Sequence, residues 1–309
     1  MMFIARMFVA VAALAILAWL VDPRQVADAL RSADGLLAAS GVAFGFLVLA
    51  LNTWKWRALI RMRGMEVPYP ALYELNLVSM LYGMLLPGQI AGEAAKVLRL
   101  MQYRTERVPL VASVLTDRVT GFLGLLLVGS IGVACTGAPA GVIVALAATT
   151  VAALLVCAVL LRPSSVSEAA SGDGRLAMLW SAASKVISAF SEYRAHPGGL
   201  VWATVLATAY QASITVNALI FGAALNLDLP AVEMLWIVAV VSVAQLLPIT
   251  IAGIGTREGA FIYLLGAYGV TKPDALALSL LMLFGNLSIA SAGALTSLRL
   301  PGRQRTSTR

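Results

Sequence analysis

The stretch LLPGQIAGEAAKVLR, residues 85–99, combines a Pro-Gly break with three ionisable side chains inside a very apolar sequence. Its first eight residues, LLPGQIAG, recur without a gap as LLPITIAG at 246–253, and this second copy also continues into charged residues. A repeated Pro/Gly break followed by charge, within hydrophobic segments, is typical of a substrate site near the middle of a bilayer. The rest of the chain is therefore interpreted around these two breaks.

The composition is that of a polytopic membrane protein. Of 309 residues, 60% are hydrophobic and 12% are charged, and the mean hydropathy is +0.89. A soluble domain carries about 25% charged residues, so this chain has too little polar surface to cover a soluble globule. The net charge of +7 comes from lysines and arginines gathered in predicted loops, which indicates membrane topology and not nucleic-acid binding. The only histidine, His196, lies in a loop, and the two cysteines fit no metal or disulfide spacing, so we expect no metal and no cofactor.

Hydrophobic runs long enough to cross a bilayer, which takes about 20 residues, predict six full membrane spans. They lie at residues 3–21, 35–54, 108–135, 141–161, 200–225 and 275–298. Two further hydrophobic segments are interrupted by Pro and Gly, and we predict that each is a broken helix pair, at 68–103 and at 231–270. The whole chain, 1–309, is therefore expected to form a single all-α integral membrane domain.

Basic residues orient the predicted loops, because cytoplasmic loops carry an excess of lysine and arginine. The basic tail, 299–309, follows the last span, and four basic residues directly follow the second span, namely Lys55, Arg57, Arg61 and Arg63. The polar connection at 163–198 contains an amphipathic helix that we expect on the cytoplasmic surface. Both termini of this multi-pass protein are then expected in the cytoplasm.

The same topology gives the two broken pairs opposite orientations, the first beginning and ending on the cytoplasmic side and the second on the outer side. As re-entrant hairpins they would form an inverted repeat, the arrangement that alternating-access carriers use. Topology alone equally allows four full spans. However, each charged side chain that faced lipid at depth would cost roughly 2.5–3.5 kcal/mol, which favours short arms that line a wet, protein-walled cavity.

Charged neighbours inside these segments need partners on other helices. Asp117 and Arg118 lie about ten residues into a predicted span, and residues at i and i+1 do not face each other on a helix. The two therefore cannot simply neutralise one another. The same rule predicts that Arg257 and Glu258 do not neutralise one another either.

Glu93 and Lys96, at i and i+3, can pair within the first broken pair. We expect both broken pairs and the helix of Asp117 to meet in one polar cluster around a cavity. In the alternative interpretation, these charges form structural ion pairs that hold broken helices together without touching a substrate. The predicted cavity residues are Gln89, Glu93, Lys96, Arg99, Asp117, Arg118, Thr250, Arg257 and Glu258. The predicted helix breaks are Pro87, Gly88, Gly92, Pro248, Gly253 and Gly255.

The predicted cavity suits an anionic headgroup such as a phosphate. Its seven charged members carry a balance of +1, and arginine forks match phosphate geometry well. Glycines at the breaks would let backbone approach a ligand closely. Half-helix N-termini after the two prolines would direct positive dipole ends toward it.

Three motifs, in this order and spacing, resemble the lysylphosphatidylglycerol synthase transmembrane-region family, also called flippase-like membrane proteins. The motifs are LPG…GE…R within 86–99, TDR…G within 116–121 and LPIT…GIGTREG within 247–259. The resemblance covers nearly the whole chain and implies an integral protein of the bacterial or archaeal inner membrane. Gln89 stands where many relatives have a small residue. The family's motif positions are occupied here by Glu93, Arg99, Asp117, Arg118, Arg257 and Glu258.

The resemblance also implies a role in lipid movement. The best-understood relatives couple this domain to a cytoplasmic aminoacyl-transferase and move the modified phospholipid between leaflets. Others occur with pathways for isoprenoid, hopanoid or glycan-linked lipids. Because this chain ends soon after its last predicted span, lysyl transfer is not expected of it.

We therefore expect a lipid flippase or carrier, whose partners are a membrane lipid or lipid-linked substrate and enzymes of lipid or glycan biosynthesis. One alternative is a membrane-embedded lipid-modifying enzyme with Glu93 or Asp117 as general base. Another is a scaffold of a lipid or glycolipid synthesis complex. The inverted repeat favours the carrier, because symmetry between two leaflet-facing states has no obvious use in an enzyme. The sequence contains no nucleotide-binding motif, so direct use of ATP is not expected.

Overall fold

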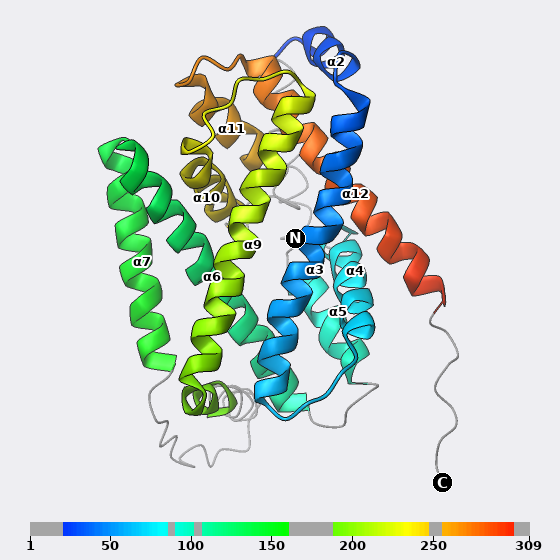
Figure 1. The fold of residues 1–309 in the computed structure, drawn as a ribbon, viewed down its shortest axis with the longest axis vertical. Helices are drawn as coiled ribbons and strands as arrows, with labels where there is room; N and C mark the ends of the chain where they lie inside the picture. The colour runs from blue at the N-terminus through cyan, green and yellow to red at the C-terminus, as the bar shows by residue number, and fades with distance from the viewer. Residues whose placement is uncertain (1–20, 86–89, 102–106, 161–187, 247–254, 300–309) are drawn as a thin grey trace, which may run out of the picture.

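The computed structural model describes residues 21–85, 90–101, 107–160, 188–246 and 255–299, and within these ranges it contains helices and no strand. In chain order the helices are α2 (Pro23–Arg31), α3 (Gly35–Met62), α4 (Tyr69–Leu85), α5 (Ile90–Leu100), α6 (Arg107–Thr136), α7 (Ala140–Leu160), the short 3-10 helix η1 (Glu192–Ala195), α9 (Pro197–Ala224), α10 (Glu233–Leu246), α11 (Thr256–Gly266) and α12 (Lys272–Arg299). Figure 1 shows α3, α6 and α9 running along most of the long axis of the molecule, with α12 crossing it obliquely.

Within the part of the chain that the structure describes, four helices are long and apolar enough to cross a membrane, which confirms the predicted all-α membrane protein. They are Gly35–Met62, Val108–Thr136, Pro197–Ala224 and Lys272–Ser297. At 1.5 Å per residue, a helix of this length extends about 40 Å, which exceeds the roughly 30 Å hydrocarbon core of a bilayer. α7 coincides with the predicted span at 141–161, whereas the predicted first span, 3–21, lies almost wholly outside the described residues.

Both predicted broken pairs consist of two short helices packed against each other, α4 with α5 and α10 with α11. α5 and α11 each have 11 residues and are therefore about 16 Å long, roughly half the thickness of a hydrocarbon core. In Figure 1 the first pair lies in the lower half of the molecule and the second in the upper half. The helix ends that flank residues 86–89 and 247–254 point toward the middle of the long axis. Pro87, Gly88, Gln89, Pro248, Thr250 and Gly253 lie outside the described residues.

Two glycines allow α5 and α12 to pack directly against the backbone of α4. A Cβ added to Gly92 on α5 would lie 2.3 Å from the carbonyl oxygen of Ser79 on α4. A Cβ added to Gly293 on α12 would lie 2.2 Å from the carbonyl oxygen of Leu77, also on α4. Because no larger residue fits at either position, α4 is clamped between α5 and α12, and the predicted break residue Gly92 acts through close packing.

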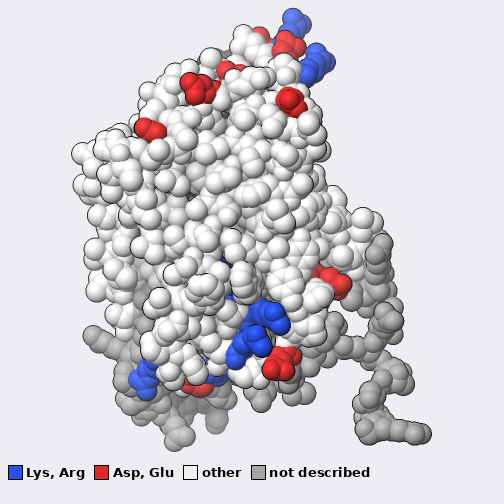
Figure 2. All heavy atoms as spheres, in the orientation of Figure 1, with Lys and Arg blue, Asp and Glu red and all other residues white. Residues whose placement is uncertain are grey.

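The surface is divided into charged ends and an uncharged middle. Figure 2 shows acidic and basic side chains near the upper and lower ends of the face drawn, with a broad band between them that carries none. Many large apolar side chains are exposed, including Leu36, Val144 and Tyr263 at 81%, 66% and 81%. Such a band is what contact with hydrocarbon requires, because charged side chains there would be costly.

The connection that precedes α9 is anchored to the body of the protein. Its predicted amphipathic helix lies mostly outside the described residues, but Phe190 and Tyr193 at its end are buried. The hydroxyl of Tyr193 donates a hydrogen bond to the carbonyl oxygen of Leu59 at 3.2 Å, and Glu192 forms an ion pair with Arg63. Burial raises the pKa of the Tyr193 phenol, so it remains a neutral donor.

Candidate functional site

Lys55 is buried inside the helix bundle, so the prediction that it belongs to a basic loop after the second span is wrong. Residues 46–63 contain neither Gly nor Pro, and α3 therefore continues to Met62, just before Gly64 at φ +65°. The Nζ of Lys55 lies 3.1 Å from Oδ1 of Asp117 and donates to the carbonyl oxygen of Asp117 at 3.3 Å. The exposed fractions of the two side chains are 3% and 7%.

Glu93 on α5 joins two basic side chains. The Nζ of Lys96 lies 3.0 Å from its Oε2, which confirms the predicted i, i+3 pair. Its Oε1 accepts a hydrogen bond of 2.9 Å from Nη2 of Arg118 on α6, so Arg118 does find a partner on another helix. Lys96 also lies over the ring of Trp56 on α3, with 4.7 Å from Nζ to the ring centroid, a cation–π contact.

These five side chains form what we call the charged cluster, made of Lys55, Glu93, Lys96, Asp117 and Arg118. They come from α3, α5 and α6, and they comprise three cations and two carboxylates. Asp117 and Arg118 are sequence neighbours on different sides of α6, because the Asp117 side chain is 7% exposed and the Arg118 side chain 41% exposed. The cluster thus has a closed side at Lys55 and an open side at Arg118.

Arg257 and Glu258 on α11 do neutralise each other, which makes the prediction for this neighbouring pair wrong. The Nη2 of Arg257 lies 2.6 Å from Oε1 of Glu258. The reason is the start of the helix, where Glu258 folds back so that its Oε2 accepts a hydrogen bond of 2.6 Å from the backbone N–H of Gly255. Gly255 has φ +90°, which allows the chain to turn into α11 at this point.

Ser279 on α12 completes this second set. Its hydroxyl accepts a hydrogen bond of 2.8 Å from Nε of Arg257 and donates one of 2.9 Å to Oε1 of Glu258. The side chains of Arg257 and Glu258 are 5% and 2% exposed. We call these three residues the α11 set. Because guanidinium, carboxylate and hydroxyl are bonded to one another, the α11 set is a closed hydrogen-bonded unit.

The described contacts give the predicted cavity residues two separate sets of partners. The charged cluster lies on α3, α5 and α6, and the α11 set lies on α11 and α12. Figure 1 shows α5 in the lower half of the molecule and α11 in the upper half. We expected one cluster to join both broken pairs. The described contacts join the first pair to the helix of Asp117, and they do not include the second pair. Arg99, one turn beyond Lys96, keeps its Nη1 buried without a hydrogen-bond partner among the described residues.

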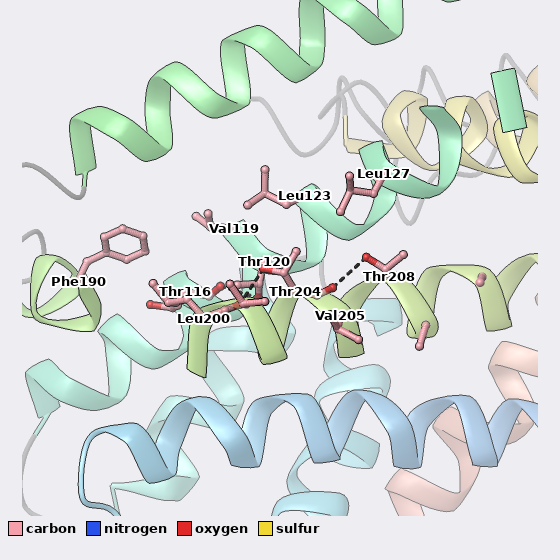
Figure 3. Close-up of a pocket in the computed structure, with 13 residues that line it drawn as sticks. Thr116, Val119, Thr120, Leu123, Leu127, Phe190, Leu200, Thr204, Val205 and Thr208 are labelled. Atoms are coloured by element: carbon pink, nitrogen blue, oxygen red, sulfur yellow. Dashed lines mark hydrogen bonds between the residues drawn. The ribbon is translucent and has the colours of Figure 1, made fainter. Parts of the chain in front are cut away.

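An apolar groove of about 720 Å³ lies between α6 and α9, with Phe190 at one end (Figure 3). Four threonines line it, and each donates its hydroxyl to a carbonyl oxygen one turn earlier in its own helix, at 2.8–2.9 Å. They are Thr116, Thr120, Thr204 and Thr208. With their hydroxyls satisfied in this way, they present methyl groups beside Leu123 and Leu127, so the groove accommodates hydrocarbon.

Sequence reasoning missed Lys55 and Ser279. The signal for Lys55 was the absence of Gly and Pro between residues 46 and 63, which predicts that the helix continues past the end of the apolar run. No local signal could identify Ser279, because a serine in an apolar helix becomes a polar partner only when another helix brings charges to it.

A known protein family matches this chain over most of its length, and one relative matches it over about a third. A family model described as "Lysylphosphatidylglycerol synthase TM region" matches residues 4–287. A UPF0104 membrane protein of Methanothermobacter thermautotrophicus is 31% identical over 112 residues, which are 36% of this chain and 33% of that protein. The matched segment therefore spans about a third of that relative.

Proposed function

The chain belongs to the lysylphosphatidylglycerol synthase transmembrane-region family, and from this premise we propose that it is a flippase for a lipid with an anionic headgroup. The observation that carries the proposal is the charged cluster, in which three cations and two carboxylates meet among apolar helices. Ionisable groups within membrane segments are costly and commonly mark the pathway of a substrate or ion. The excess of one positive charge favours an anion.

Arg118 is the group that would bind the headgroup. Its side chain is the most exposed of the charged cluster, and an ion pair with Glu93 joins it to the other members. A guanidinium presents two parallel N–H donors, so it can hold a phosphate in bidentate fashion. An arriving phosphate would compete with Glu93 for Arg118, while Lys96 keeps Glu93 paired. The Lys55–Asp117 pair would hold α3 and α6 together behind this exchange.

The lipid tails would lie in the apolar groove, on the side of α6 that faces α9. Thr116 and Thr120 of the apolar groove flank Asp117 and Arg118 in sequence, so the groove and the charged cluster share one short segment of this helix. A volume of about 720 Å³ with an apolar lining suits a hydrocarbon chain. A lipid could then place its headgroup at Arg118 while its tails remain in the membrane or the groove.

The two broken pairs supply the proposed route between leaflets. They extend toward the middle of the molecule from opposite ends (Figure 1), which supports an inverted repeat and alternating access. We place the protein in the cytoplasmic membrane with both termini inside, and the enzymes that make or use the lipid are its proposed partners. The basic residues at the end of α3 and after α12 support this orientation.

The test is a reconstituted flipping assay. The purified full chain is placed in vesicles that contain a headgroup-labelled phosphatidylglycerol, and an impermeant quencher reports the leaflet of each label. Wild type should accelerate movement between leaflets without changing the lipid. Arg118→Gln should slow it at least about tenfold, because a hydrogen bond to a charged group contributes about 1.5–3 kcal/mol.

The matched control is Arg31→Gln, which removes one positive charge from an exposed surface pair with Asp28. This variant should flip lipid at the wild-type rate. If Arg118→Gln also matches wild type, or if no labelled lipid moves faster than in empty vesicles, the proposal fails for this lipid class. A chemically altered lipid that stays in its original leaflet would point to the lipid-modifying enzyme instead.

A further inference from the structure

A second hollow, of about 490 Å³, lies between α3 and the start of α4. It is lined by Ala50, Leu51, Trp54, Arg57 and Tyr69. The α3 residues of this lining follow helical spacing and so share one helix face. Trp54 is 52% exposed, whereas the next residue, Lys55, is 2% exposed. The hollow therefore opens on a different face of α3 from the one that contributes to the charged cluster.

Arg57 is the cation of this hollow. No ion pair involving it is formed within the described ranges, and its Nε is buried there without a hydrogen-bond partner. A guanidinium without an internal anion is a strong site for an external one, particularly a phosphate. The hollow thus contains a basic group that no acidic side chain compensates among the described residues.

The walls of the hollow are aromatic and preformed. The hydroxyl of Tyr69 donates a hydrogen bond of 2.8 Å to the carbonyl oxygen of Ala50, which fixes the start of α4 against α3. Trp54 also lines the hollow. Tryptophan and tyrosine concentrate where hydrocarbon meets lipid headgroups, because their rings are apolar and their tips polar. This pair of rings marks the hollow as an interfacial site.

The position of the hollow identifies its occupant. Figure 2 shows basic side chains over the lower part of α3, directly below the uncharged band. One turn above the hollow, Leu47 is 64% exposed on the same helix face and continues an apolar track upward. A ligand that binds Arg57 and follows this track needs a phosphate at one end and hydrocarbon at the other.

We propose that this hollow binds a glycerophospholipid of the surrounding leaflet, with Arg57 holding its phosphate between Trp54 and Tyr69. The acyl chain runs along Leu51 and Leu47. This lipid is a bound neighbour of the protein and not the transported molecule, so the inference does not depend on flippase activity. By binding Arg57, the lipid anchors α3 at a fixed depth in the membrane–water interface.

Native mass spectrometry of the purified full chain tests the proposal. Phosphatidylglycerol is titrated against wild type, Arg57→Gln and the matched control Arg61→Gln, which removes the same charge from an exposed position one turn further along α3. Arg57→Gln should raise the apparent dissociation constant about tenfold, the effect of one charge-assisted hydrogen bond. Arg61→Gln should change it less than about twofold. Trp54→Ala tests the aromatic wall and should weaken binding in the same direction.

Further arms identify the source of the phosphate and separate this site from the charged cluster. Diacylglycerol with the same acyl chains should not bind at the Arg57 site, and glycerol phosphate should not displace the phospholipid. The titration is repeated on an Arg118→Gln background, where the Arg57-dependent site should persist even if flipping is lost. Three results would each overturn the proposal. They are equal weakening of phosphatidylglycerol binding by Arg57→Gln and Arg61→Gln, diacylglycerol binding as tight as that of the phospholipid, and displacement of the phospholipid by glycerol phosphate.

Discussion

The charged cluster and the α11 set are both groups of ionised side chains within the helix bundle, but they differ in how completely they are buried. The charged cluster takes five side chains from three helices and leaves Arg118 41% exposed. The α11 set takes three from two helices, and its charged side chains are at most 5% exposed. A set that satisfies itself stabilises structure, whereas a set with an open cation can also bind a ligand.

The two interpretations of the intramembrane charges, a substrate site and structural ion pairs, therefore apply to different parts of the molecule. The α11 set has the properties of a structural ion pair, because the start of α11, the Gly255 turn and Ser279 together satisfy it. The charged cluster has the properties expected of a substrate site, because one of its members faces outward. The following predictions test this division, in order of decreasing effect on stability.

Lys55→Met should cause the largest loss of stability. It leaves the carboxylate of Asp117 buried without its ammonium partner, which costs about 3–5 kcal/mol. The expected result is a markedly lower melting temperature of the purified protein in detergent. Adding Asp117→Leu to Lys55→Met should recover most of the loss, since an apolar pair can replace a buried ion pair. Unchanged melting of Lys55→Met would show that this pair does not hold α3 to α6.

Gly92→Ala should destabilise the first broken pair, whereas the corresponding substitution in the second pair should not. The new Cβ would lie 2.3 Å from the Ser79 carbonyl oxygen, so α4 and α5 must move apart at a cost of about 1–3 kcal/mol. The control is Gly259→Ala on α11, where no atom of another described element lies within 4 Å of the new Cβ. That variant should melt at or slightly above the wild-type temperature, because alanine favours helix. Equal effects of the two substitutions would contradict the clamped packing of α4.

Ser279→Ala should destabilise the α11 set without affecting lipid movement. It removes two buried hydrogen bonds to charged groups, and we expect a loss of about 1.5 kcal/mol in the free energy of unfolding. The flipping rate per folded molecule should stay within about twofold of wild type. A strong loss of flipping with normal melting would place the α11 set in the substrate path and remove the distinction between the two sets.

Arg118→Gln should have the smallest effect on stability and the clearest effect on transport. Its side chain is 41% exposed, so losing the ion pair with Glu93 should cost less than about 1 kcal/mol. Thermal melting compared with the flipping assay measures both properties in one preparation. If melting falls as far as in Lys55→Met, Arg118 is structural, and the open side of the charged cluster loses its proposed role.

Local pattern was sufficient for the helices but not for all of their ends. The apolar runs at 108–135, 200–225 and 275–298 correspond closely to α6, α9 and α12. The run at 35–54 ended too early, because hydropathy drops at Lys55 while the helix continues to Met62. Spacing correctly paired Glu93 with Lys96 and wrongly separated Arg257 from Glu258, where the first turn of α11 redirects the Glu258 side chain.

By itself, the sequence determined that this is an all-α membrane protein of a known family, that Pro and Gly interrupt two of its apolar segments, and which charges lie beside these interruptions. These features follow from composition and local spacing, which act within one helix. The tertiary structure decided which charges meet. Lys55 reaches Asp117 across 62 positions and Ser279 reaches Arg257 across 22, and such contacts depend on how helices pack, which no single segment encodes.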